Sequence, residues 1–235
     1  MKYVLSQEIL EKFPTTQLGI ITLRNIDNSK NNSEILALLK SAEESIKEVF
    51  KEINPSEHER IKCWREVYSA FGAKPKKYNC SIEAMSKRIL ENEQIPDISD
   101  IVNLYNYISL KNLISAGGDD SDKIEGDITL TLAKGDEIFT EIGQEEPKNP
   151  NPGEAIFIDD KSVLGRRWNW RQSNKTRITK ESKNINLQLE GVFPVTKEDI
   201  EASAQELISL LKKFFNAECK FYLINKENPV AEIIK

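Results

Sequence analysis

A segment rich in arginine and tryptophan holds the residues best suited to contact a ligand. It begins at Gly165 and includes Arg166, Arg167, Trp168, Trp170 and Arg171. Indole rings and guanidinium planes stack on each other, and both stack on nucleobases. Between Lys161 and Lys183 there are eight Lys or Arg and one acidic residue, a net +7, whereas the whole chain carries −5. A basic, aromatic segment on an acidic chain is typical of a surface that binds a polyanion.

The same segment predicts where its side chains point. In a β-strand, the odd-numbered residues from Arg167 to Arg171 would share one face and the even-numbered residues from Arg166 to Gln172 the other. Trp168 and Trp170 would then not both be solvated, so we expect at least one of them in the core or in a pocket. The alternative is a surface hairpin whose cation–π pairs form without any ligand.

The histidine and cysteine content argues against several kinds of site. His58 is the only histidine, which leaves almost no room for a catalytic triad or a metal site that uses His. The three cysteines, Cys63, Cys80 and Cys219, are far apart and form no CxxC pair. Neither a disulfide framework nor a zinc site is therefore indicated. We expect no metal and no other cofactor.

Length and composition are ordinary for a globular protein. The 235 residues are 30% charged and 39% hydrophobic, and no apolar run approaches the roughly 18 residues that cross a bilayer. The N-terminus becomes charged too early for a signal peptide. We therefore expect a cytoplasmic protein without a membrane partner, and the oligomeric state is left open.

Hydrophobic periodicity predicts a mainly helical first half. After a strand over residues 18–26, helices are expected over 33–53, 56–72, 81–91 and 101–115. Ser56 and Glu59 have the spacing of a capping box at the start of the second helix, where His58 would be exposed. The loop over 74–78 carries three Lys and either is solvated or touches phosphate.

The second half reads as strands. A turn is predicted over residues 116–120, followed by strands at 126–133, 137–142, 154–158, 163–171 and 185–193. Thr196 and Asp199 then cap a helix that runs to about residue 216, and a last strand covers 219–224. This order suggests a single α+β domain in which helices cover a strand-rich core.

Several short segments, in order and spacing, resemble the editing domain of the phenylalanyl-tRNA synthetase β subunit, and in particular its freestanding version. These segments are Tyr68–Gly72, Ile101–Tyr107, Asp119–Ile124, Arg166–Ser173, Thr179–Ile185 and Glu190–Gly191. The resemblance covers about Trp64 to Phe193. It implies a three-layer, β-sandwich-like core flanked by helices. The chain would then divide into an N-terminal strand–helix extension (1–60), the editing-like core (61–193) and a C-terminal helix–strand unit (194–235).

The resemblance also assigns a pocket. In the synthetase this domain binds a mischarged amino acid and hydrolyses its ester to tRNA. The family's Thr-Asn-Tyr pocket motif falls on Tyr105 to Tyr107, and its pocket Glu falls on Glu190. The family's pocket His falls near Gly117 and its Gly-Gly near Trp170, so the amino acid specificity should differ. The predicted substrate-binding residues are Tyr105, Asn106, Gly117, Trp170 and Glu190.

The resemblance thus implies an aminoacyl-tRNA deacylase acting in trans, with tRNA as its partner. An aminoacyl ester is already activated, so a held water and a few oriented polar groups suffice, and no catalytic nucleophile is assigned. Asn106 and Glu190 would order the amino group or the water. The predicted RNA contacts are Arg166, Arg167, Trp168, Arg171 and Lys175.

Two other functions stay open. A non-catalytic RNA-binding or amino-acid-binding module could share the fold, and the lack of a pocket His and the acidic balance of the chain favour it somewhat. An accessory protein that interacts with a synthetase is a third reading.

Overall fold

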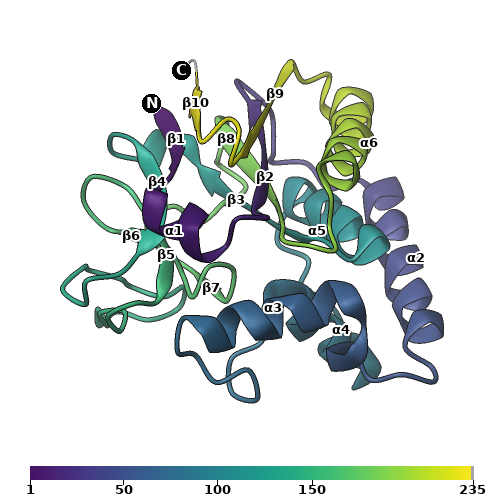
Figure 1. Ribbon diagram of the computed structural model, residues 1–235. Helices are drawn as coiled ribbons and strands as arrows, with labels where there is room; N and C mark the ends of the chain where they lie inside the picture. Colours follow the sequence, from purple (N-terminus) through teal and green to yellow (C-terminus); the bar gives the residue numbers. More distant parts are fainter. Residues whose placement is uncertain (234–235) are drawn as a thin grey trace.

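The computed structural model describes residues 1–233 and consists of two β-sheets with helices around them (Figure 1), which confirms the expected α+β class. The larger sheet has the strand order β10-β1-β4-β5-β6-β7. Its strands are β1 (Lys2–Leu5), β4 (Ile128–Leu132), β5 (Ala155–Ile158), β6 (Val163–Arg166), β7 (Arg171–Gln172) and β10 (Val230–Glu232). The smaller sheet, ordered β3-β8-β2-β9, contains β2 (Gln17–Leu23), β3 (Ser115–Asp120), β8 (Ile185–Gly191) and β9 (Cys219–Asn225).

Helices cover the smaller sheet on one side. The six α-helices within residues 1–233 are α1 (Gln7–Lys12), α2 (Ser33–Val49), α3 (Glu59–Ala70), α4 (Ser81–Leu90), α5 (Asp100–Asn112) and α6 (Lys197–Phe215). In Figure 1 the smaller sheet lies between the strands of the larger sheet and the helices α5, α6 and α2. Every residue of β8 is buried, because this strand is interior to its sheet and covered on both faces.

The N-terminal residues contribute an interior strand to each sheet. β2 pairs antiparallel with both β8 and β9, while β1 pairs parallel with β4 and antiparallel with β10. Residues before 61 and after 193 are therefore hydrogen-bonded into the same two sheets as the segment between them.

Two predicted elements are wrong. Residues 116–120, predicted as a turn, form most of β3, because Gly117 and Gly118 here lie in an extended strand paired with β8. Residues 137–142, predicted as a strand, form only an isolated bridge at Glu141. The Glu137 carboxylate instead accepts hydrogen bonds from the backbone N–H groups of Lys134 and Gly135, which ties the start of this segment to the residues before it.

The single strand predicted over 163–171 is also wrong, since it is two strands joined by a turn over residues 167–170. Arg167 (φ 48°) and Trp168 (φ 62°) both adopt the left-handed backbone conformation, which ends the alternation of side chains. The turn sends the Trp168 indole into the core, where it meets the rings of Trp64 (5.2 Å between centroids) and Phe13 (5.5 Å). The expectation that at least one of the two Trp residues is buried is confirmed.

Of the two capping boxes predicted from the sequence, one is present. Thr196 and Asp199 form the expected reciprocal capping box of α6. The box predicted for Ser56 and Glu59 is wrong, because a short 3₁₀ helix (η1, Pro55–Glu57) intervenes and His58 becomes the N-cap of α3. His58 Nδ1 accepts the backbone N–H of Arg60 at 3.3 Å, so the only histidine has a structural role here.

The two adjacent glycines of β3 predict opposite responses to the same substitution. A Cβ on Gly118 would lie 2.7 Å from Leu187 Cδ2 and 3.1 Å from the carbonyl oxygen of Asn186, whereas a Cβ on Gly117 meets no atom within 4 Å. We expect Gly118→Ala to lower the free energy of unfolding by about 1–3 kcal/mol through overpacking. Gly117→Ala should change it by less than about 0.5 kcal/mol. Urea denaturation of both variants checks this, and equal losses would contradict it.

Candidate functional site

A cavity of about 220 Å³ opens where α5, β3, β8 and the β6–β7 hairpin meet. Its lining includes Tyr105 and Asn106 from α5, Gly117 from β3, Trp170 from the hairpin turn and Glu190 from β8. The structure therefore brings together all five residues predicted to bind substrate, although they come from four separate elements.

Strand register positions the floor of the cavity. Gln188 and Glu190 are two residues apart on β8, so their side chains leave the same face of the sheet. Gly117 pairs with Gln188 across the β3–β8 ladder. Because Gly117 has no side chain and nothing lies within 4 Å of its Cβ position, the cavity keeps this space open.

Glu190 is a buried carboxyl group held by a chain of hydrogen bonds. Only 5% of the residue is exposed. Its Oε2 accepts a hydrogen bond from Asn169 Nδ2 at 2.9 Å, and Asn169 Oδ1 accepts one from the Tyr68 hydroxyl at 2.9 Å. Burial raises the pKa of Glu190 to about 8, with a smaller contribution from the nearby charge of Asp119, while the Asn169 hydrogen bond lowers it. At neutral pH the carboxyl group is therefore mainly protonated.

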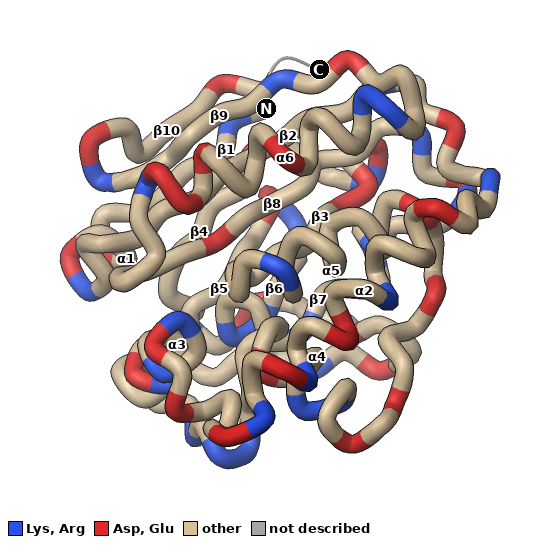
Figure 2. The backbone as a smooth tube through the Cα atoms, turned by 90° about the vertical axis from the view of Figure 1, so that its right-hand side faces the viewer, with Lys and Arg blue, Asp and Glu red and all other residues tan. Residues whose placement is uncertain are grey.

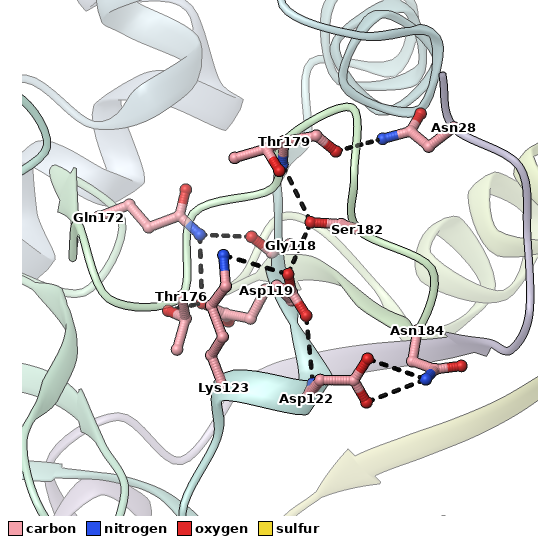
Figure 3. Close-up of polar contacts among 11 residues, drawn as sticks. Asn28, Gly118, Asp119, Asp122, Lys123, Gln172, Thr176, Thr179, Ser182 and Asn184 are labelled. Atoms are coloured by element: carbon pink, nitrogen blue, oxygen red, sulfur yellow. Dashed lines mark hydrogen bonds and ion pairs between the residues drawn. The ribbon is translucent and has the colours of Figure 1, made fainter. Parts of the chain in front are cut away.

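Asp119 is a second buried carboxyl group in the cavity wall. Its Oδ1 accepts hydrogen bonds from the Thr176 hydroxyl and from Gln172 Nε2 (3.1 Å), and its Oδ2 accepts one from Gln188 Nε2 (2.8 Å). Figure 3 shows the contacts to Thr176 and Gln172. Burial raises the pKa of Asp119 to about 6, against the opposing effect of these hydrogen bonds. Asp119 therefore remains mostly ionised at neutral pH, unlike Glu190.

The α5 residues supply polar atoms without partners of their own. Among residues 1–233, the Asn106 side chain makes no hydrogen bond to protein, neither to a nearby backbone group nor to another side chain. Burial raises the pKa of Tyr105, followed by the charge of Asp119. Both side chains are therefore available to a ligand in the cavity.

The expected exposed basic face does not form. Arg166 and Arg167 both pair with the buried Glu154, at 2.8 Å and 2.6 Å, and their side chains are 11% and 4% exposed. Trp168 is 2% exposed. Glu154, which lies outside the basic segment, pairs with both arginines, and Trp168 packs against Trp64 and Phe13, so these three side chains form no exposed face. Their contact with RNA stays a prediction.

The other two predicted RNA contacts are also ion-paired, although they remain more accessible. Arg171 lies 2.8 Å from Glu141, and its side chain is 47% exposed. Lys175 pairs with Glu125 (2.9 Å) and with Asp159 (2.8 Å). Figure 2 accordingly shows basic and acidic residues interspersed along the chain rather than gathered on one face.

The Arg167 guanidinium instead organises the wall of the cavity. It lies 3.8 Å from the ring centre of Tyr78 and 4.5 Å from that of Trp170. The Tyr78 and Trp170 rings meet edge to face, with centroids 5.0 Å apart. These two cation–π contacts fix Trp170 at the cavity, and they form with a buried guanidinium instead of one on a surface hairpin.

Sequence reasoning missed several residues of the site, among them Asp119, Asn169, Gln172 and Gln188. Asp119 was placed in a turn, where a carboxylate is unremarkable. Asn169 lies between two Trp residues in a segment that resembles the family, and this resemblance could have identified it as a site residue. Gln188 could have been found by period-two alternation from Glu190.

The described part of the chain has no cluster of three or more His, Cys, Asp or Glu residues that could hold a metal ion. Within residues 1–233, no helix is long and apolar enough to cross a bilayer.

Comparisons with known proteins place the site in a family context. Residues 63–216 match the B3/4 domain, which belongs to the phenylalanyl-tRNA synthetase β-subunit family. No curated protein sequence matches the chain. Among solved structures, an N-terminal fragment of the phenylalanyl-tRNA synthetase β subunit from Pyrococcus horikoshii is similar, with 12% identity and a TM-score of 0.46. The alignment covers 92% of this chain and 49% of that one, so this chain spans about half the length of the fragment.

The raised pKa of Glu190 predicts how stability depends on pH. The folded state holds this proton up to about pH 8 and the unfolded state only up to about 4.5, so stability falls as pH rises between these values, by up to about 1.4 kcal/mol per pH unit. Glu190→Gln removes this titration while the contribution of Asp119 remains. We expect the variant to gain stability relative to wild type as pH rises from 5 to 8.

Urea denaturation at unit intervals from pH 5 to 9 measures this difference. Glu145→Gln, in an exposed loop, is the matched control and should show a difference that does not vary with pH. A pH-independent difference for Glu190→Gln as well would mean that Glu190 is not titrating from a buried state.

Proposed function

The chain belongs to the B3/4 domain family, and we propose that it hydrolyses the ester between a mischarged amino acid and its tRNA, acting in trans. One observation carries the proposal: Asn106 and Glu190, predicted from the family's pocket motifs, line the same cavity inside the matched region. A polar residue without a protein partner thus faces a buried carboxyl group across a space open to a ligand.

The chemistry of the cavity suits an aminoacyl group. A bound ammonium compensates the charge of a buried carboxylate, which Glu190 otherwise avoids by keeping its proton. The remaining lining is largely apolar and aromatic, including Phe157, Leu164 and Trp170, and can contact an amino acid side chain. A volume of about 220 Å³ is below the roughly 300–1,000 Å³ of sites for drug-sized ligands, so only the aminoacyl group enters and the nucleotide stays at the mouth.

Hydrolysis would depend on positioning. Water attacks the ester carbonyl carbon, the bond to the ribose oxygen breaks, and that oxygen takes up a proton. Holding the water close to the ester carbonyl carbon, in the orientation for attack, lowers the barrier to hydrolysis without a nucleophilic side chain. The Asn106 amide can order either the amino group or the water.

We propose that the loop over residues 74–78, and not the basic segment, contacts the tRNA. Lys74, Lys76 and Lys77 are exposed, and no ion pair to them forms within the described chain. Lys77 Nζ lies 5.2 Å from the ring centre of Tyr78, which in turn packs against Trp170 at the cavity. The loop therefore lies next to Trp170, a residue of the cavity lining, and we assign to it the phosphates that follow a bound aminoacyl group.

A second function, an amino-acid-binding module without hydrolysis, is favoured by one observation. His58 caps α3 and does not line the cavity, so the site has no imidazole to move a proton. Assays of the wild-type protein on a panel of mischarged tRNAs decide between the two, since the binding module would hydrolyse none of them.

We expect Asn106→Ala and Glu190→Ala each to slow deacylation of the best mischarged tRNA by ten-fold or more, about 1.4 kcal/mol in the barrier. The reason is loss of an oriented polar group at the aminoacyl group. Binding of uncharged tRNA should be nearly unchanged, because the RNA surface lies outside the cavity. Asn149→Ala and Glu145→Ala, in an exposed loop, are the controls. Full activity in both cavity variants would exclude the assigned roles.

Replacing Lys74, Lys76 and Lys77 together by Ala should weaken tRNA binding. The slope of log affinity against log salt should fall by about 1 for each lysine that contacts a phosphate. The control replaces three exposed lysines: Lys212 in the last turn of α6, Lys220 in β9 and Lys226 just after β9. In Figure 1 β9 lies at the opposite edge from α3 and α4. A salt slope that is unchanged in the loop variant, or lowered equally in both, would remove the loop from the RNA surface.

A further inference from the structure

The hydrogen bonds of Asp119 determine which atoms Gln188 presents to the cavity. A carboxylate only accepts hydrogen bonds, so the Gln188 amide must turn its NH₂ group toward Asp119 Oδ2, at 2.8 Å. The other amide atom, Oε1, has no partner among residues 1–233, and Gln188 lines the cavity. Asp119 thus leaves a carbonyl oxygen, an acceptor, for whatever the cavity holds.

Gln172, in β7, donates through its amide in the same way. Its Nε2 donates to the Gly118 carbonyl oxygen and to Asp119 Oδ1 (Figure 3), so its own Oε1 is likewise left without a protein partner in the part described. With Glu190 two residues beyond Gln188, three side-chain acceptors line one cavity.

We propose that Asp119 is a positioning residue that holds the carbonyl oxygens of Gln188 and Gln172 toward the cavity, where together with Glu190 they bind a primary ammonium group. A primary ammonium has three donors and no acceptor, which complements this set. The inference rests on the proposed function for the identity of the ligand, the α-ammonium of an aminoacyl group, and it assigns that group's partners beyond Glu190.

Charge supports the same ligand class. Arg171 is the one cationic residue in the described lining of the cavity, and Glu141 pairs with it at 2.8 Å. Asp119, which is ionised at neutral pH, and Glu190, which can release its proton when a cation binds, therefore face the cavity with no cation committed to them. A ligand that brings a positive charge is favoured over a neutral or anionic one of the same shape.

Binding of small probes tests the proposal without any hydrolysis. The probes are phenylalaninamide and leucinamide, each compared with its deamino analogue, which lacks only the ammonium group. We expect the wild-type protein to bind at least one amide about ten-fold or more tightly than its analogue at pH 7, measured by calorimetry or NMR titration. Equal affinities, or no binding of either amide, would overturn the proposal and need no variant.

A swap of donor and acceptor tests the role of Asp119. In Asp119→Asn the new NH₂ group replaces Oδ2, so the Gln188 amide must rotate and present its own NH₂ group to the ammonium. The preference for the amide should drop to less than about three-fold. The double variant also carries Gln188→Glu. One oxygen of the new carboxylate accepts the NH₂ group introduced at position 119, and the other oxygen faces the cavity as an acceptor, so this variant should recover most of the preference.

A merely structural role of Asp119 would not give this pattern, because a second substitution would not restore selectivity. Retention of the full preference in Asp119→Asn, or no recovery in a folded double variant, would overturn the positioning role. The two proposals also fail separately. If the protein prefers the ammonium probes but deacylates no tRNA, the ammonium site stands and the proposed hydrolase activity is rejected. If it deacylates tRNA but shows no preference for the ammonium probes, the hydrolase activity stands and the ammonium site is rejected.

Discussion

Strand β8 sets the conditions that the rest of the site must meet. It is buried along its whole length, yet it carries three polar side chains, Asn186, Gln188 and Glu190. A buried polar group without a partner costs on the order of 1–3 kcal/mol, so each of these requires a neighbour that can bond to it. The neighbours come from different places: Arg24 just after β2, Asp119 on β3, and Asn169 on the hairpin turn. These hydrogen bonds join β8 to segments that are far apart in the sequence, although Asn186 Nδ2 has no partner within residues 1–233.

The hairpin turn shows how a strained backbone is kept in place. Two consecutive residues other than glycine in the left-handed region are uncommon and cost energy. The Trp168 ring, buried against Trp64 and Phe13, and the Arg167–Glu154 pair, which is nearly inaccessible, hold the turn. Removing one partner of a buried ion pair costs about 3–5 kcal/mol, so this pair fixes the turn strongly. Asn169 can reach Glu190 only because the turn is held there.

Much of the fold could be predicted from the sequence, because local residue patterns indicate most of its helices and strands. Period-two and helical spacing predicted β2, β4, β8 and most helices, and the motif order located the pocket residues of α5 and β8. The errors arose where the local structure or the exposure of a residue depends on a partner that is distant in the sequence. Two glycines in β3 look like a turn unless their pairing with β8 is known. The alternation in 166–172 looks like one strand, and its positive charge looks exposed. Glu154, Glu141 and Asp159, which neutralise that charge, lie outside the segment.

The unfilled space at Gly117 bears on how such a site changes over evolution. Its neighbour Gly118 is fixed by close packing, but a Cβ at position 117 would lie at the cavity and meet no protein atom within 4 Å. Substitutions there are therefore close to neutral for folding while they alter the shape offered to a ligand. A change of residue 117 during evolution can therefore alter which ligand the cavity selects, and a later change can reverse it, while every protein along the way still folds.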